Sequence, residues 1–455
     1  MKILFFDSVL ILCLILGLVG VVFGLHYIYS NREWGIVVLL GSGTFIIISI
    51  ISLLCKREIR TNIAMIFIAS CSGIFLFNLT LEITKTDLRP INPSYRMLKV
   101  TKSLGIALDI RSANEVILDM RALGELVYPY YSPSKYVNNP SLLLQDQLFP
   151  LGSISSVLTL LCNENGPYIT NYNDRFGFNN DDRVYDRAGE RWLLVGDSFT
   201  HGYCVQQDDT IAGVLRKRGL NAISIGVIAN GPLRELASLK EYGSHLKPKV
   251  VLWFFYGGND FQDLQLELKV PALLQYLNNP SHSQNLVNRQ REIDTFHINK
   301  AEKIDRIPLY YGKYIQNDKE QEDTIINFLK GVFTLHRFRQ LIGLSYNFYT
   351  KGLSKDKRSL LPTIREIMVA AKNTTASWGG EIYFVYLPQI GKRHNEYDEV
   401  RVIIEELGIK FINFSDIHNS YKEEINTLTS THYNETGYKL LADFVHLYIT
   451  QNRNF

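Results

Sequence analysis

Three polar residues, far apart in the chain, are of the types that acyl transfer needs. Ser198 follows Gly-Asp in the sequence GDS, Asn259 lies in GGND, and His432 lies in STHYNETGY. A serine hydroxyl becomes a nucleophile when a base takes its proton, and the oxyanion that forms on the acyl carbon needs hydrogen-bond donors already in place. His432 is the candidate base and Asn259 a candidate donor. The spacing therefore predicts acyl chemistry at Ser198.

The segments that must position these residues alternate between strand-like and helix-like patterns. Residues 192–196 form a short apolar run that ends in glycine, which is typical of a buried strand, so Ser198 lies on the turn that leaves its C-terminal end. Open parallel sheets place their binding sites at that end. The other predicted strands are residues 222–226, 250–256, 381–387 and 410–414, and the predicted helices between them are residues 210–218, 233–242, 359–377 and 396–407. This alternation predicts an α/β fold with a doubly wound parallel sheet.

Two residues indicate the ends of the helix predicted over residues 210–218. Asp209 is a plausible N-cap, and Gly219 is a plausible stop at the C-terminal end.

These motifs resemble those of the SGNH, or GDSL-type, hydrolases, and the resemblance covers residues 173–449 with an unmatched stretch in the middle. It implies a flavodoxin-like SGNH hydrolase domain in which Ser198 is the nucleophile. The oxyanion hole would comprise the backbone N–H of Ser198, the side chain of Asn259 and a second backbone N–H. This last group corresponds to Ala229, where the family usually has glycine. Alanine can serve if its φ and ψ are ordinary, because only an N–H is required.

The histidine motif departs from the family pattern. The family usually carries an aspartate two or three residues before the histidine, to hold the ring in the correct tautomer. Here those positions are Ser430 and Thr429. We therefore expect one of two arrangements on the second ring nitrogen of His432: a carbonyl or hydroxyl group from residues 428–431, or a carboxylate from a distant loop, with Asp416 as the candidate. The residues after His432 do resemble the family's closing helix.

A second histidine lies near the nucleophile. His201 is three residues beyond Ser198 and is an alternative base. So close a neighbour on one turn more often caps or packs, so His432 is the favoured base.

The N-terminal part of the chain predicts a membrane anchor. Residues 6–29, 34–55 and 63–81 are long apolar stretches, and each is long enough to cross a bilayer as a helix. A cleavable signal peptide is the competing interpretation of the first stretch. That stretch is too long for a typical signal, lacks a convincing cleavage site and is followed at once by another apolar stretch, which favours three transmembrane helices.

Charges near the apolar stretches predict their orientation. Residues 56–60 form the most basic short loop, whereas the charges of residues 30–33 balance. By the positive-inside rule the basic loop and the N-terminus are cytoplasmic. The predicted protein is thus a multi-pass protein of the cytoplasmic membrane whose C-terminal domain is extracytoplasmic, which means periplasmic in a Gram-negative cell.

The predicted organisation has three parts. Residues 1–84 form the anchor, residues 85–190 form a leading region packed on the catalytic domain, and residues 191–455 form the SGNH domain. Residues 261–358 are an insertion that strand-helix alternation does not require. Because it begins directly after Asn259, we interpret it as a lid or substrate-shaping subdomain; the alternative is a peripheral insertion that touches nothing catalytic.

Composition argues against several other classes of function. The formal net charge is only +3, and no basic stripe with interleaved aromatic residues occurs, so nucleic acid is not an expected partner. The sequence contains no glycine-rich phosphate loop, CxxC pair or HExxH motif, so we assign no metal and no cofactor.

Two of the five cysteines lie in the predicted exported domain. Cys162 and Cys204 are natural disulfide partners in an oxidising compartment, and the alternative is two separate buried thiols. The other three cysteines lie in or beside the apolar stretches.

The resemblance implies a membrane-anchored esterase or O-acyltransferase. Exported, anchored members of the family act on acyl esters, often acetyl, of extracytoplasmic polysaccharide or on small acyl esters. A transferase would need an acyl donor from across the membrane, and three helices are too few for such a channel, which implies a membrane partner. The alternative is a non-catalytic glycan-binding or assembly component, in which the missing acid beside His432 marks a degenerate site.

Overall fold

The computed structural model describes residues 2–30, 32–83, 105–109, 111–138, 148–304, 357–389, 396–422, 424–427 and 432–452. These residues belong to two compact units. The first contains the three N-terminal helices, and the second contains the other elements.

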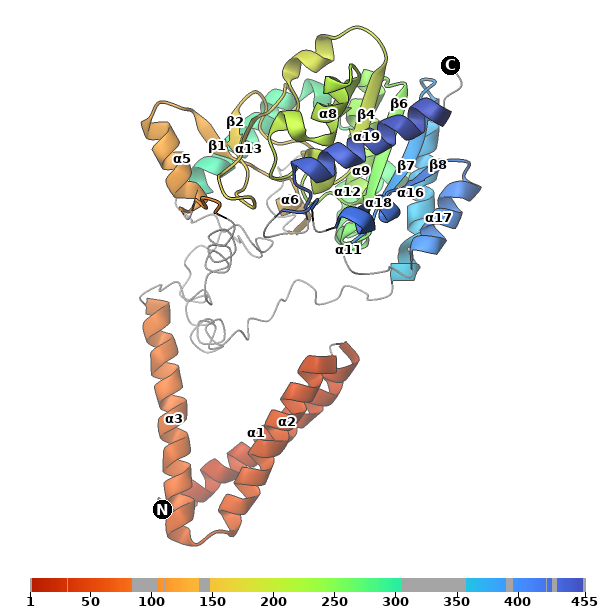
Figure 1. Ribbon diagram of the computed structural model, residues 1–455. Coiled ribbons are helices and arrows are strands. Elements are labelled where there is room, and N and C mark those ends of the chain that lie inside the picture. Colours follow the sequence, from red (N-terminus) through yellow and green to blue (C-terminus); the bar gives the residue numbers. More distant parts are fainter. Residues whose placement is uncertain are drawn as a thin grey trace. The chain divides into compact units, whose positions relative to one another are not determined.

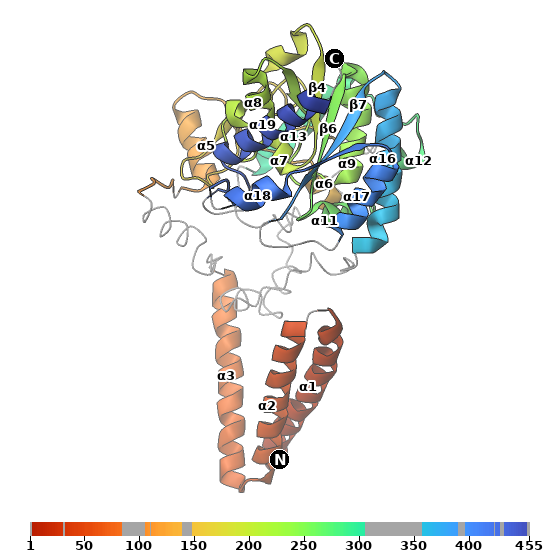
Figure 2. The same ribbon diagram turned by 45° about the vertical axis from the view of Figure 1, so that its right-hand side comes forward.

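The first unit consists of three long apolar helices, α1 (Lys2–Ser30), α2 (Arg32–Leu54) and α3 (Arg57–Ile83). α1 and α2 lie side by side (Figures 1 and 2). An ion pair of 3.2 Å joins Asp7 of α1 to Arg60 of α3. Within the described residues, the segment Arg57–Thr80 is long and apolar enough to cross a membrane, while Asp7–Leu18 and Ser42–Leu54 are shorter apolar segments. The three predicted helices are present, and the crossing of a bilayer by all three stays a prediction.

The second unit is built on a parallel sheet of five strands. Their order across the sheet is β5 (Asn221–Ser224), β4 (Arg191–Val195), β6 (Val250–Tyr256), β7 (Glu381–Leu387) and β8 (Lys410–Asn413). In chain order this is 2-1-3-4-5, the flavodoxin-like arrangement of a doubly wound sheet. Each strand lies within one residue or two of its predicted bounds, so the sheet prediction is confirmed.

Helices cover both faces of the sheet. α9 (Pro232–Ser238), α12 (Pro271–Asn278), α16 (Leu361–Ala376) and α17 (Tyr397–Glu406) pack on one face, and α8 (Ile211–Lys217) and α19 (Glu435–Asn452) on the other (Figures 1 and 2). Successive strand residues point to opposite faces, so Trp253 enters the first core and Phe254 the second. A strand buried on both faces needs apolar residues at every position, which explains the continuous run of β6.

The start of α8 differs from the prediction by one residue. Thr210 is the N-cap, because its Oγ1 accepts a hydrogen bond from the Gly213 N–H at 3.0 Å. Asp209 instead ends the preceding 3-10 turn, Gln207–Asp209. Gly219 follows the helix with φ +86°, which fits its predicted role as a stop.

The leading region forms a small sheet against the parallel one. β2 (Leu158–Leu160) pairs in parallel with β1 (Val127–Pro129) and antiparallel with β3 (Thr170–Tyr172), and α5 (Ala113–Ala122) packs beside them. Buried aromatic residues of this region, including Phe149 and Phe178, belong to the same core as the parallel sheet. The leading region and the parallel sheet therefore share an apolar core, while the small sheet packs with α5 in a cluster of its own.

The described half of the insertion is also part of that core. It contains α11 (Asp260–Glu267), α12 and α13 (Gln290–Ile304), whose Leu273, Tyr276 and Ile293 are fully buried. His297 of α13 is fully buried as well, with Nδ1 3.0 Å from the hydroxyl of Tyr136. These residues form a packing layer on the core, and both interpretations of the insertion, as a lid and as a peripheral segment, stay predictions. The remainder of the predicted lid, residues 305–356, lies outside the described residues.

Candidate active site

Ser198 is the first residue of the short helix α7 (Ser198–His201), directly after β4. The preceding Asp197 caps this helix, because its Oδ1 accepts a hydrogen bond from the Phe199 N–H at 2.9 Å. The turn is tight: a Cβ at Gly196 would lie 2.1 Å from Thr200 Oγ1, so this position requires glycine. The GDS sequence thus holds the Ser198 hydroxyl at the C-terminal end of β4, where the side chain is 6% exposed.

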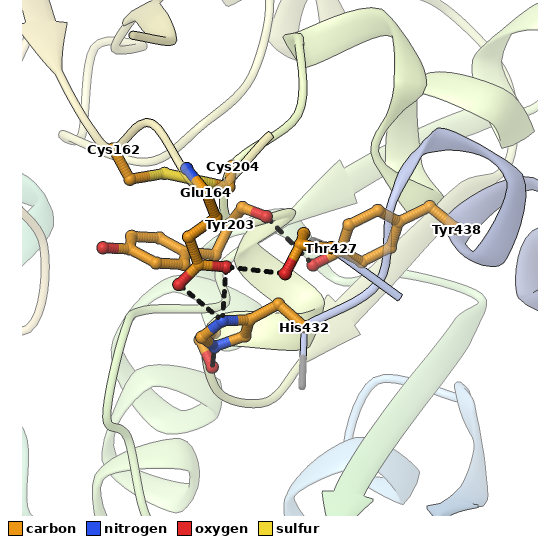
Figure 3. Close-up of a disulfide and its surroundings, with 8 residues drawn as sticks. Cys162, Glu164, Tyr203, Cys204, Thr427, His432 and Tyr438 are labelled. Atoms are coloured by element: carbon orange, nitrogen blue, oxygen red, sulfur yellow. Dashed lines mark hydrogen bonds and ion pairs between the residues drawn. A yellow bond between two sulfur atoms is a disulfide. The ribbon is translucent and has the colours of Figure 1, made fainter. Parts of the chain in front are cut away.

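His432 lies between Ser198 and an acidic side chain. Its Nε2 is 3.0 Å from Ser198 Oγ, and its Nδ1 is 3.1 Å and 3.3 Å from the two carboxylate oxygens of Glu164 (Figure 3). A carboxylate accepts hydrogen bonds, so the Nδ1–H donates to Glu164 and Nε2 is left to accept the proton of Ser198. This is the order of groups that activates a serine.

Glu164 is the orienting group that the sequence analysis missed. A carboxylate from a distant loop holds the ring, which is the second of the two predicted arrangements, but the candidate Asp416 was wrong. Asp416 lies on α18 (Ser415–Tyr421), where its backbone carbonyl accepts from Ser420. Residues 428–431, the source of the other arrangement, lie outside the described residues. The sequence feature that could have indicated Glu164 is its position on a turn between two strand-like runs, two residues after Cys162.

A disulfide fixes the Glu164 turn. Cys162 and Cys204 are bonded, with their Cα atoms 5.5 Å apart, so the predicted pairing is confirmed and the alternative of two separate thiols is wrong. The Glu164 N–H donates to Cys204 Sγ at 3.2 Å. Thr427 Oγ1 donates to the Glu164 carboxylate at 3.1 Å (Figure 3). Glu164 is therefore held through both its backbone and its carboxylate.

Two opposing influences set the pKa of His432. Burial by itself lowers that pKa, but the charge and hydrogen bond of Glu164, together with the charge of Asp197, outweigh it and hold the pKa above its ordinary value. Tyr203 and Phe199 cover the ring, with centroid distances of 4.8 Å and 5.3 Å. The imidazole is thus a strengthened base in a largely enclosed position.

His201 is a packed side chain. It is 1% exposed, and its ring meets the edge of Tyr130 at a centroid distance of 4.9 Å. Burial lowers the pKa of His201 to about 3. Neither ring nitrogen has a hydrogen-bond partner among the described residues. The structure therefore favours His432 over His201 as the base.

Ala229 lies on the loop that follows β5, and its backbone is not ordinary. Its φ is +60°, in the left-handed region, which contradicts the expectation of an ordinary φ. An L-residue pays about 1–2 kcal/mol for this conformation, so the surroundings must hold it. The Arg234 guanidinium does so by donating to the Ala229 carbonyl. The family's usual glycine would adopt this conformation without strain.

A buried ion pair anchors the same loop. Arg234 of α9 and Glu267 of α11 are almost completely buried, with Nε and Oε1 2.9 Å apart. The Glu267 carboxylate also accepts from the N–H groups of Gly231 at 2.7 Å and Leu233 at 3.0 Å. The charge of each partner is thus compensated, and the loop is tied to the helix that begins after Asn259.

Asn259 lies after β6, at the N-cap position of α11. Its Nδ2 donates to Asp263 Oδ2 at 2.7 Å, which fixes the plane of the amide. Ala229, Ser198 and Asn259 thus follow the C-terminal ends of the three adjacent strands β5, β4 and β6.

Several buried carboxyl groups lie around this end of the sheet. Burial, reinforced by neighbouring carboxylates, raises the pKa values of Glu235, Asp260 and Asp263 well above the ordinary range. Burial also raises the pKa of Asp197 to about 6. Among the described residues, no group of three or more His, Cys, Asp or Glu side chains is arranged to hold a metal ion.

Comparisons with known proteins give likenesses to solved structures. No protein-family model matches the chain, and no curated protein matches it. The chain is similar to a solved structure from Desulfitobacterium hafniense DCB-2, described as a protein of the G-D-S-L family, with 14% identity and a TM-score of 0.32. The match covers 56% of this chain and 98% of that one. The geometry of the site, and not this likeness, carries the functional proposal.

The Glu164–His432 contact predicts a specific change in the titration of the imidazole. In a Glu164→Gln variant the charge that raises the pKa of His432 is lost while burial remains, so this pKa should fall. Titration of the His432 ring by NMR measures it directly. Asp416→Asn is the matched control, since it removes a carboxylate that does not contact the ring. An unchanged pKa in Glu164→Gln, or an equal fall in both variants, would contradict the assignment.

Proposed function

We propose that this chain is a serine esterase or O-acyltransferase that works through an acyl-enzyme at Ser198. The observation that carries the proposal is the hydrogen-bonded row of Ser198, His432 and Glu164. His432 Nε2 takes the proton as Ser198 Oγ bonds to the acyl carbon, and then returns it to the departing alcohol oxygen. Water or a second hydroxyl, deprotonated by the same nitrogen, then releases the acyl group from Ser198.

The oxyanion of each tetrahedral intermediate needs fixed donors. We propose the backbone N–H groups of Ser198 and Ala229 and the Asn259 amide for this role. Rigid surroundings of these donors support the proposal. The Arg234–Glu267 pair holds the loop of Ala229, and Asp263 holds the side-chain amide of Asn259. Such donors stabilise the developing charge without having to reorganise during the reaction.

We further propose that α1, α2 and α3 anchor the enzyme in the cytoplasmic membrane. An up-down-up arrangement brings the N-terminal ends of α1 and α3 to the same side, and the ion pair between Asp7 and Arg60 supports it. The basic residues 56–60 favour the cytoplasm for that side. The disulfide supports an oxidising, extracytoplasmic location for the catalytic domain, since disulfides persist there.

The proposed substrates are acyl esters, in particular acetyl esters, of extracytoplasmic polysaccharide or of small molecules. In the transfer direction a membrane partner would deliver the acyl donor. The alternative of a non-catalytic glycan-binding or assembly component was based on a missing acid. Because Glu164 occupies the acid's position beside His432, that reason no longer holds.

Covalent labelling tests the nucleophile. An activated acyl ester such as p-nitrophenyl acetate should acylate Ser198 in the full-length protein, as peptide mass spectrometry would show, and it should be turned over. Ser198→Ala should abolish both labelling and turnover, and His432→Ala should slow both strongly. Ser420→Ala, at an exposed serine of α18, is the control and should behave like the unmodified protein. Turnover near the normal rate in Ser198→Ala would eliminate the proposal.

Loss of an oxyanion donor should act on the chemical step. Asn259→Ala should lower kcat about a hundredfold, the usual cost of removing one such donor, and should change KM much less. Steady-state kinetics with the same ester separate the two constants. Asn288→Ala, at an exposed amide, should leave kcat unchanged. A kcat in Asn259→Ala that equals the control's would remove Asn259 from the oxyanion hole.

Reporter fusions test the proposed topology. A periplasmic reporter such as alkaline phosphatase should be active when fused after Arg89 and inactive when fused near Arg57. The reverse pattern would place the active site in the cytoplasm and exclude extracytoplasmic glycan as the substrate.

A further inference from the structure

The disulfide joins two turns that each carry one member of the proposed active site. Cys162 lies two residues before Glu164, on the turn that follows β2 in the small sheet. Cys204 lies six residues after Ser198, on the turn that follows α7. The bond therefore links the acid's turn to the nucleophile's turn across the boundary between the two sheets.

We infer that the Cys162–Cys204 bridge is a positioning element for catalysis: it holds Glu164 against His432 and thereby sets the strength of the base. This inference rests on the proposed function, because it concerns the same site. Neither cysteine touches the reacting atoms; both act through the carboxylate of Glu164.

Apart from the bond from Thr427 Oγ1 to the Glu164 carboxylate, two further hydrogen bonds of this turn lie toward the leading region. Asn163 Nδ2 donates to the Asp109 carbonyl at 2.8 Å, and the Asp109 N–H donates to the Gly166 carbonyl at 3.0 Å. These bonds shape the turn but do not fix its distance from His432. The covalent tie toward the catalytic sheet is the disulfide, reinforced by the bond from the Glu164 N–H to Cys204 Sγ.

The Cys204 side of the bridge is coupled to both the nucleophile and the base. The N–H of Tyr203 donates to the carbonyl of Ser198 at 3.1 Å, so the turn is continuous with α7. The ring of Tyr203 packs against His432 (Figure 3). Cys204 itself has φ +66°, a left-handed conformation that an L-residue adopts only under strain. Loss of the bridge removes a constraint that holds this conformation.

The chemical consequence follows from the electrostatics of His432. Reduction adds two electrons and two protons to the bridge and gives two thiols, with a dithiol or phosphine as the reductant. The Glu164 turn is then free to move away from His432. Burial of the ring persists, and burial lowers the pKa of His432, so this pKa falls as the carboxylate withdraws. A ring that is no longer oriented also transfers the proton less efficiently, and a misplacement of about 1 Å can cost about a hundredfold in rate.

Both cysteine side chains are fully buried in the shared interface. A reductant therefore has no direct access to the sulfur atoms in the folded protein. This burial marks the bridge as a permanent part of the site, which is set when the domain folds in an oxidising compartment.

A variant cycle tests the inference in the full-length protein. Cys162→Ala/Cys204→Ala should lower kcat by about ten- to a hundredfold with little change in KM, and should move the acidic limb of the pH profile of kcat/KM to lower pH, as Glu164→Gln does. Adding Glu164→Gln to the double alanine variant should cost little more, because both changes remove one interaction. Cys71→Ala, at an unpaired cysteine, is the control and should leave the profile unchanged.

The same variants show whether the disulfide has only a structural role. In that case the double alanine variant would have a lower maximum of kcat/KM, but the acidic limb of its pH profile would stay at the same pH. The loss of activity caused by Glu164→Gln would then add in full to the loss caused by the double alanine change. That result would overturn the inference. If the double alanine variant does not fold, Cys162→Ser/Cys204→Ser, whose side chains are close to cysteine in size, provides the same comparison of pH profiles.

A measurement without turnover separates this inference from the proposed function. In a Ser198→Ala background, NMR titration should give a lower pKa for His432 after loss of the bridge than before it. If the wild-type protein neither labels nor turns over acyl esters but this shift occurs, the proposed function fails and the positioning role stands. If turnover occurs but the pKa of His432 is unchanged by loss of the bridge, the positioning role fails alone.

Discussion

The hydrogen bond between Glu164 and His432 is the interaction on which the proposed site depends. It orients the imidazole, fixes the proton on Nδ1 and outweighs the burial that would otherwise weaken the base. The two residues are 268 positions apart and come from different layers of the fold. The disulfide, the Thr427 hydroxyl and the apolar cluster that contains Leu161 and Tyr203 all bring them together. The turn after β2 therefore supplies the acid of the proposed site, so the small sheet is part of that site.

The opposite side of the site is held by a different kind of interaction. A buried, well-bonded ion pair between Arg234 and Glu267 supports the loop of Ala229, and Asp263 supports the amide of Asn259. Removing two charges from water is costly even when they pair, so such a network contributes geometry more than stability. A left-handed alanine at this position is a local strain that the arginine contact offsets.

The elements with local signals were predictable from the sequence, and the contacts between distant segments were not. β6 is a continuous apolar run because both its faces are buried, and Ser198 was found because it follows such a run. His432 was found from the residues around it. Glu164 was missed because its partner lies in another layer, and no periodicity encodes that pairing. The φ of Ala229 was missed because it depends on the contact with Arg234, and the packing role of the insertion was missed because polar composition hid its buried aromatic side.

Because Glu164 and His432 come from different layers of the fold, their contact forms only when these layers dock during folding. Contacts between residues so far apart in sequence carry a large loop-closure cost and form late. A chain that has built its parallel sheet but has not yet docked the turn after β2 carries an exposed serine beside an unsupported imidazole. Such an intermediate is chemically silent toward esters. Under the proposed function, reactivity of Ser198 would therefore report completed tertiary structure, because an acylating probe would label only those molecules in which both layers have docked.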